Sequence, residues 1–153
     1  QEHAGIIRRG AKVINAYATA TVPLVTVILR KAYGGAYIVM GSKAIGADLN
    51  FCWPGAEIAV LGAAGAVGII HRRDLKAVRD EHGDQAAEAE RERLIGEYTE
   101  AVINPDKAVA IGEIDAVIAP EDTRTVIVDS LAALADKRDS RHTPTKKHDN
   151  VPL

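Results

Sequence analysis

The sequence has little of what most enzyme classes and membrane proteins need. It contains one cysteine, Cys52, among 153 residues, which excludes an internal disulfide framework and suits a reducing compartment. No apolar run reaches the roughly 18 residues of a membrane-spanning helix, so none is predicted. The net charge is only -2, which argues against binding nucleic acids or membrane surfaces through bulk charge.

Motifs of several common reaction types are also missing. The five histidines are scattered and lack metal-ligand spacing with Cys52 or with one another, so we expect no metal in this chain. Ser42 lacks the G-x-S-x-G context of a hydrolase nucleophile. Neither the G-x-G-x-x-G fingerprint of dinucleotide-binding folds nor the G-K-[ST] ending of a P-loop occurs.

Alternating strand and helix patterns are present instead, and apolar residues make up 47% of the chain. Short β-branched or apolar runs predict strands at 24–29, 47–53, 57–62 and 115–118. Helices are predicted at 3–21 (ended by Pro23), 36–43, 64–72, two within 73–103 separated at 82–84, one over 104–112, and one opening at Pro120. We expect the run at 24–29 to be buried on both faces. The alternation predicts an α/β fold.

Two strand-to-helix junctions, at 34–36 and 62–65, consist of glycine and alanine. The first turn of a helix presents N–H groups without partners inside the helix, and glycine lets a ligand approach the backbone closely. Such amides can stabilise an oxyanion without a charged side chain, and losing one donor typically costs ~3–4 kcal/mol. From the residues alone, a simple turn and close helix packing are the more frequent explanations of such segments.

Three longer segments carry a more specific resemblance: GIIRRGAKVINAYATATVPLVTVILRKAYGGAYIVMGSK, ADLNFCWPGAEIAVLGAAGAVGIIHRRDL and the ending KKHDNVPL. They are similar to the carboxyltransferase (β) subunit of biotin-dependent acyl-CoA carboxylases, the acetyl-/propionyl-CoA carboxylase family. The resemblance covers only the C-terminal portion of that subunit. Because the chain opens on Gln1 rather than Met, we expect it to be a piece of a longer protein.

The resemblance implies a crotonase-like (ClpP/crotonase) fold of ββα units. Residues 1–138 would form the C-terminal, biotin-side carboxyltransferase domain without its upstream part, and residues 139–153 would form a polar tail. The implied function is carboxyl transfer from carboxybiotin to the α-carbon of a short acyl-CoA, either acetyl-CoA or propionyl-CoA. The product would be malonyl-CoA or methylmalonyl-CoA, and the fragment would be inactive alone.

The family also implies partners and a setting. Biotin would arrive on a biotin carboxylase or biotin carboxyl carrier subunit, and the full-length protein would form a hexamer. The resemblance implies a cytoplasmic protein of fatty acid biosynthesis that binds neither nucleic acid nor membrane.

Site residues carry over from the resemblance position by position. The backbone N–H groups of Gly35 and Ala36 would form the oxyanion hole for biotin, and Gly34 would make the turn. Supporting cofactor contacts fall on Gly62, Ala63 and Gly65, and the acyl pocket on Tyr37 and Ile38. Many propionyl-type members have an acidic residue where this chain has Ile38, which puts propionyl-CoA in doubt and favours acetyl-CoA slightly.

Two other functions stay open on the sequence. A biotin-dependent acyl-CoA decarboxylase of the same superfamily, linked to a sodium pump, would use the same residues in the opposite direction. An apolar, non-catalytic oligomerisation module would explain the first helix and the apolar strands equally well.

Overall fold

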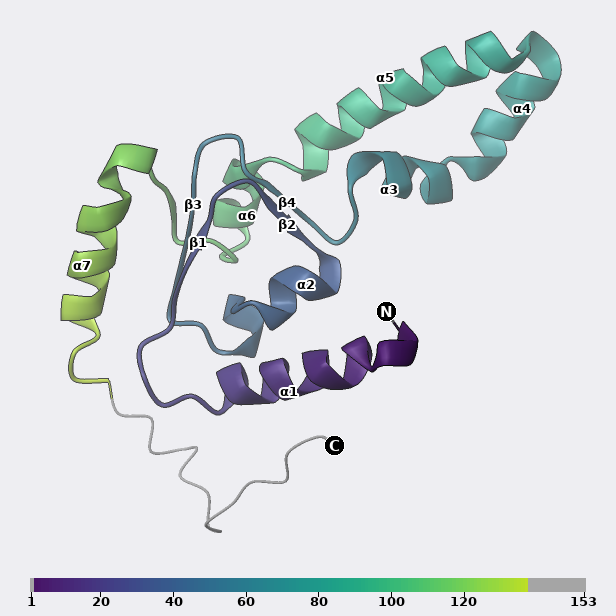
Figure 1. Ribbon diagram of the computed structural model, residues 1–153. Helices are drawn as coiled ribbons and strands as arrows, with labels where there is room; N and C mark the ends of the chain where they lie inside the picture. Colours follow the sequence, from purple (N-terminus) through teal and green to yellow (C-terminus); the bar gives the residue numbers. More distant parts are fainter. Residues whose placement is uncertain (1, 138–153) are drawn as a thin grey trace.

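Two consecutive ββα units form the centre of the computed structural model, which describes residues 2–137 (Figure 1). The first unit is β1 (Val25–Ile28), β2 (Lys31–Tyr33) and α2 (Gly34–Val39). The second is β3 (Leu49–Cys52), β4 (Glu57–Ala59) and α3 (Ala63–Ile70). The repeat confirms the predicted α/β class built from ββα units. The tail predicted at 139–153 lies outside the described residues.

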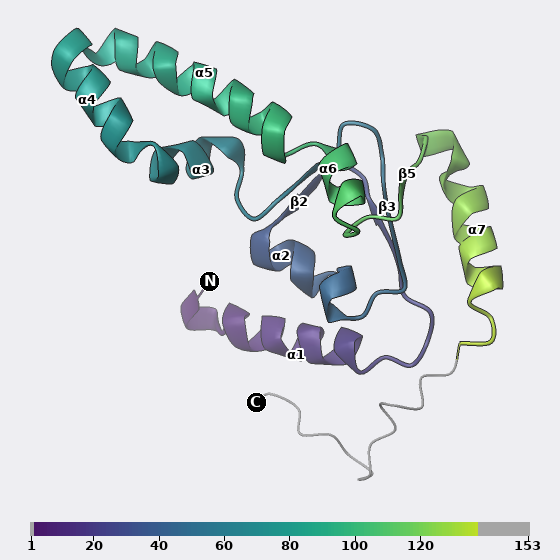
Figure 2. The same cartoon turned by 180° about the vertical axis from the view of Figure 1, so that it is seen from behind.

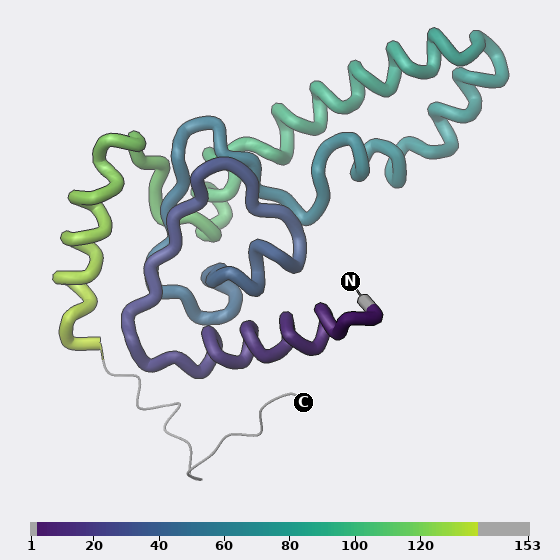
Figure 3. Tube along the Cα trace, viewed as in Figure 1, coloured from purple at the N-terminus to yellow at the C-terminus, as the bar shows by residue number. Residues whose placement is uncertain are grey.

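Equivalent strands of the two units pair with each other in two small parallel sheets. One sheet has the order β1-β3-β5, where β5 is Ala116–Val117, and the other pairs β2 with β4. In the second sheet Tyr33 lies opposite Ala59. Because the strands are parallel, the two helices that follow them, α2 and α3, begin at the same edge. The Cα trace shows β1 and β3 running side by side (Figure 3).

The remaining helices surround this centre on different sides. They are α1 (Ile6–Ala18), α4 (Arg72–His82), α5 (Asp84–Val102), α6 (Pro105–Ala110) and α7 (Thr123–Ala133), with single 3₁₀ turns at Glu2–Ala4, Lys43–Ile45 and Pro120–Asp122. The α4–α5 hairpin projects from the sheets as an arm, whereas α7 lies on the opposite side (Figure 2). No helix within residues 2–137 is both long and apolar enough to cross a membrane.

The core lies between the two sheets and the helices packed on them. Its buried cluster joins residues from both sheets and from the segments around α6, namely Ile28, Ala32, Cys52, Ala56, Ile58, Ala108 and Ile114. The prediction that 24–29 is buried on both faces was wrong, because only Ile28 of β1 is buried and Leu29 is 54% exposed.

Several predicted boundaries also need correction. The helix predicted at 3–21 is broken at Gly5, whose φ of 78° is left-handed, and it ends at Ala18 rather than at residue 21. The segment 31–33, for which no strand was predicted, is the strand β2. The helix predicted at 36–43 is α2, which begins two residues earlier, at Gly34. Three residues without alternation carry no strand pattern, so only pairing with β4 fixes β2.

The later helices follow the prediction with local differences. The helix predicted at 64–72 ends at Ile70, and a separate helix, α4, starts at Arg72. The separation of two helices near Gly83 is confirmed. The last helix begins at Thr123, because Pro120 opens a 3₁₀ turn instead.

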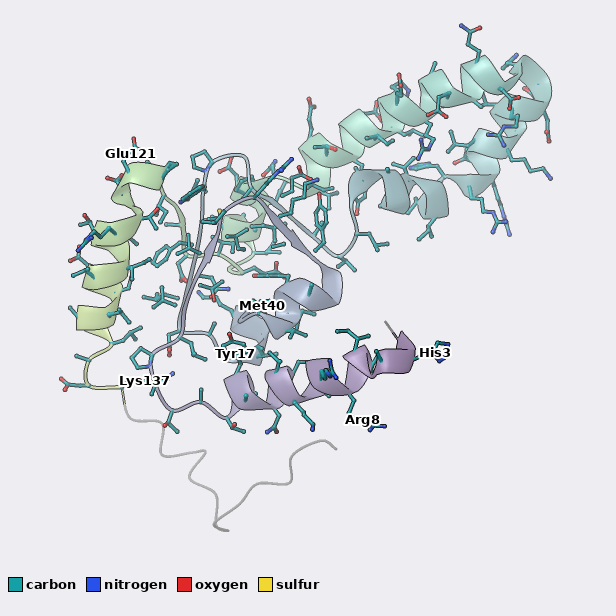
Figure 4. The ribbon with its side chains drawn as sticks, viewed as in Figure 1. His3, Arg8, Tyr17, Met40, Glu121 and Lys137 are labelled. Carbon is teal, nitrogen blue, oxygen red and sulfur yellow. The ribbon has the colours of Figure 1, made fainter. Side chains whose placement is uncertain are left out.

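A partly buried ion pair joins the segment after α7 to the segments that lead into β1 and β3. Lys137 donates from Nζ to the Asp48 carboxylate at 2.8 Å and to the carbonyl of Val22 at 3.0 Å. The same carboxylate accepts from the amide of Leu24 at 2.7 Å. Figure 4 shows Lys137 beyond the end of α7, near the loop that leads into β1. These contacts hold the last described residue against the two segments that enter the sheet β1-β3-β5.

Candidate functional site

The two Gly/Ala junctions lie next to each other at the edge where β2 and β4 end. A Cβ atom added to Gly34 would lie 2.9 Å from the backbone oxygen of Val60, so the two segments of backbone are in close contact there. A Cβ added to Gly62 would lie 3.5 Å from the ring of Tyr33, the residue that precedes α2. The fold therefore brings together segments that are 28 residues apart in sequence.

The first turn of α2 offers backbone amides without acceptors. The helix begins at Gly34, so the N–H groups of Gly35 and Ala36 have no carbonyl within the helix to bond. Among residues 2–137, no other element supplies an acceptor to either amide, and both residues are exposed. Two neighbouring donors of this kind can hold negative charge on a ligand oxygen.

The first turn of α3 is arranged differently. The amides of Gly65 and Ala66 both donate to the carbonyl of Gly62, at 3.0 Å each. In the described part of the chain, the amide of Ala63 has no such acceptor. Of the three residues predicted to support the cofactor, Gly65 thus has its amide occupied inside its own helix turn.

Two cavities flank α2, and Tyr37 lines both of them. The first, of about 380 Å³, is bordered by Gly34, Gly35 and Ile38 of α2 and faces apolar residues of β4 and the α5–α6 region; we name it the α2 cavity. The second, of about 480 Å³, lies between α2 and the β1–β2 segment and is bordered by Ala36. Neither cavity is lined by Gly62, Ala63 or Gly65. The structure therefore groups the residues predicted around α2 and leaves the α3 junction beside them.

A buried polar cluster lies under α2 that the sequence reasoning missed. Asn50 in β3 is 0% exposed, and Ser42, which follows α2, is 2% exposed. The hydroxyls of Tyr37 and Ser42 and the Oδ1 atom of Asn50 have no hydrogen-bond partner in the described residues. The one available signal was the polar Asn50 within the apolar run ADLNFCW.

Burial dominates the ionisation of the groups in this cluster. Desolvation raises the pKa of Tyr37, and the neighbouring side chain of Asn50 opposes that rise. Burial likewise raises the pKa of the Cys52 thiol. Both groups are therefore neutral near pH 7 and act as uncharged hydrogen-bonding or packing groups. Within residues 2–137, no cluster of three or more histidine, cysteine or acidic side chains could hold a metal ion.

Comparison with known proteins places this chain in a family. Residues 1–151 match the family described as "Carboxyl transferase domain". Because the match covers nearly the whole chain, the chain belongs to the carboxyl transferase domain family. This agrees with the resemblance inferred from the sequence.

Three individual proteins illustrate what this chain is similar to within the family. The propionyl-CoA carboxylase beta chain of Saccharopolyspora erythraea is 56% identical, over 100% of this chain and 27% of that protein. The methylmalonyl-CoA decarboxylase subunit alpha of Propionigenium modestum is 50% identical, over 100% of this chain and 28% of that protein. The crystal structure of transcarboxylase 12S with methylmalonyl-CoA bound superposes with a TM-score of 0.89 at 48% identity, covering 100% of this chain and 28% of that one. The chain thus spans little more than a quarter of the length of these relatives.

Proposed function

We propose that this chain is the biotin-side part of a carboxyltransferase subunit that moves a carboxyl group from carboxybiotin to a short acyl-CoA. The observation that carries the proposal is the family match over residues 1–151. The relatives named propionyl-CoA carboxylase and transcarboxylase 12S support this reaction. Because the chain spans only about a quarter of those proteins, the activity belongs to the complete subunit.

The Gly35 and Ala36 amides are the proposed oxyanion hole. When bound, carboxybiotin supplies the carboxyl group and the base for the α-proton of the acyl thioester. The chain's own residues then have to orient the ligand and stabilise negative charge on its oxygen. The residues around α2 fit a ureido group, because two neighbouring unpaired amide donors lie between two cavities, with Gly35 bordering the α2 cavity and Ala36 the second. Gly34 supports them by making the turn, and Gly62 and Ala63 support them from the adjacent junction.

The acyl group is proposed to pass along the α2 cavity, where Ile38 is 42% exposed and lines the wall with Tyr37. The relatives' names favour propionyl-CoA, whereas the apolar Ile38 favours acetyl-CoA. One methylene in an apolar pocket is worth only ~1–3 kcal/mol. Comparing kcat/KM for acetyl-CoA and propionyl-CoA in wild type and Ile38→Asp measures how far this side chain decides the choice.

The partners of the complete protein follow from the same proposal. We propose a biotin-carrying partner and a homo-oligomer, supported by the solved transcarboxylase 12S, which is described as a hexamer assembly. A cytoplasmic location and a role in fatty acid biosynthesis complete the proposal. The relative named methylmalonyl-CoA decarboxylase supports a second candidate, the same residues working in the decarboxylating direction.

Gly35→Val in the complete subunit, assembled with its biotin-carrying partner, tests the oxyanion role. Gly35 has an ordinary φ and open space around its Cβ position, so we expect the variant to fold and assemble. The added side chain would block access to the neighbouring amides. We expect carboxyl transfer to fall about 10²–10³-fold, the usual cost of losing one oxyanion donor.

Gly96→Val is the matched control, because Gly96 also has open space and lies on the arm formed by α4 and α5. Rates are compared per assembled active site, in both the carboxylating and the decarboxylating direction. Wild-type turnover in Gly35→Val would refute the oxyanion role. An assembled wild-type complex that is inactive in both directions would instead favour a non-catalytic assembly module.

A further inference from the structure

Asn50 is a polar side chain in an unusual place. It lies in β3 between Leu49 and Phe51 and is 0% exposed. Burying a carboxamide costs free energy unless all its polar groups are hydrogen-bonded, so its presence in an apolar strand needs an explanation. Its Oδ1 atom has no partner in the described residues.

The side chain of Asn50 lies against α2 and the segment that follows it. Its Nδ2 donates to the carbonyl of Gly41, just beyond the end of the helix, at 3.4 Å. That carbonyl also accepts from the hydroxyl of Thr26 in β1 at 2.7 Å. Within α2 itself, the buried hydroxyl of Tyr37 has no hydrogen-bond partner among the described residues, and Asn50 is its neighbour. The Nδ2 group of Asn50 can donate to the hydroxyl oxygen of Tyr37, a direction that favours the phenolate and agrees with the lowering effect of Asn50 on the Tyr37 pKa.

The backbone of Asn50 is fixed independently of α2. Its amide donates to the carboxylate of Asp115 at 2.8 Å, and its carbonyl accepts from the amide of Asp115 at 2.7 Å. The same carboxylate forms an ion pair with Lys43, in the 3₁₀ turn after α2. Asn50 is therefore a rigid point in the sheet from which a side chain can hold a short helix.

We infer that Asn50 is a positioning residue that holds α2, through Gly41 and Tyr37, in the orientation that the Gly35 and Ala36 amides need. The inference rests on the proposed function of those amides. Tyr37 follows Ala36 directly, so a bond between its hydroxyl and Asn50 fixes the turn that carries both donors. Such bonds are often long or misaligned without ligand and tighten when the ligand binds.

The test compares Asn50→Ala, Tyr37→Phe and the double variant in the complete subunit with its biotin-carrying partner. We expect Asn50→Ala to lower kcat by about 100-fold with little change in KM for acyl-CoA, because a small displacement of a catalytic group has that effect. Tyr37→Phe, which keeps the ring, should lower kcat less. The double variant should be no slower than Asn50→Ala, since both changes remove one contact.

Hydrogen exchange of the amides in α2 gives a readout that does not depend on turnover. We expect faster exchange in α2 for Asn50→Ala, with exchange in α3 unchanged. The control is Cys52→Ala, also in β3 and 0% exposed, which should lower the thermal unfolding midpoint without changing kcat per active site or the exchange of α2.

The outcomes separate this inference from the proposed function. Unchanged exchange in α2 for Asn50→Ala, or unchanged kcat in an active complex, would overturn the positioning role. Kinetic effects that simply add in the double variant would overturn the link through Tyr37. An inactive wild-type complex would remove the proposed function, and the exchange experiment would still decide whether Asn50 holds α2.

Discussion

The β2–α2 and β4–α3 junctions have similar compositions and lie at the same edge, yet glycine has different roles in them. Gly34 has a φ of 54°, and a Cβ there would meet the backbone oxygen of Val60 at 2.9 Å. Gly62 has a φ of -61°, and its Cβ would make an ordinary contact of 3.5 Å with the Tyr33 ring. The first junction requires glycine, and the second tolerates a larger residue.

The backbone amides in the first turns of α2 and α3 also differ in their hydrogen bonds. The α2 amides at Gly35 and Ala36 have no acceptor in the described chain, whereas the Gly65 amide bonds the Gly62 carbonyl. A polar cluster around Asn50 lies against α2, whereas the buried residues of α3 itself are the apolar Ala66 and Val67. A small-residue strand end is therefore compatible with an anion site at one junction and with plain packing at the other.

The largest effect that tests this contrast is the difference in stability between Gly34→Ala and Gly62→Ala. We expect Gly34→Ala to lower the free energy of unfolding by roughly 3 kcal/mol, from left-handed backbone strain and the clash with Val60. Gly62→Ala should change it by less than about 0.5 kcal/mol. Thermal unfolding of both variants measures the difference, and equal shifts would show that the two junctions have the same requirement.

A smaller effect should appear at high pH on the α2 side. Burial raises the pKa of Tyr37 above its ordinary value of 10.0, so the unfolded chain releases this proton first. The folded state therefore loses stability as pH rises above 10. Replacing Tyr37 by Phe removes this loss.

The measurement is the thermal unfolding midpoint of wild type and Tyr37→Phe from pH 8 to pH 11. The difference between the two proteins should stay constant below about pH 9 and shift in favour of Tyr37→Phe above pH 10. A constant difference across the whole range would mean that burial does not perturb Tyr37.

The smallest expected effect is a gain in stability at the α3 junction. Gly65 is exposed in the first turn of α3, with an ordinary φ and no atom near its Cβ position. Gly65→Ala should therefore raise the free energy of unfolding by about 0.5 kcal/mol through lower chain entropy in the unfolded state. A loss of stability, seen as a lower unfolding midpoint, would indicate a packing role for Gly65 like that of Gly34.

The local pattern of the sequence determined the element types and the residues of the α2 turn. Short β-branched or apolar runs predicted β1, β3 and β4, and Gly83 separated α4 from α5, because these signals act over a few neighbouring residues. The strand β2 and the true start of α2 were missed, because Lys31–Tyr33 becomes a strand only by pairing with β4.

Tertiary structure alone decided which small-residue junction borders the cavities and what packs against it. Gly34 meets Val60, and Asn50 meets Tyr37, Gly41 and Asp115, across chain separations that no local pattern encodes. Parallel pairing of β2 with β4 brings Gly34 to Val60, and pairing of β3 with β5 brings Asn50 to Asp115, so a shift of register by one residue would change these contacts. The sequence thus contained the donors, and the pairing of distant strands determined which of them face a cavity.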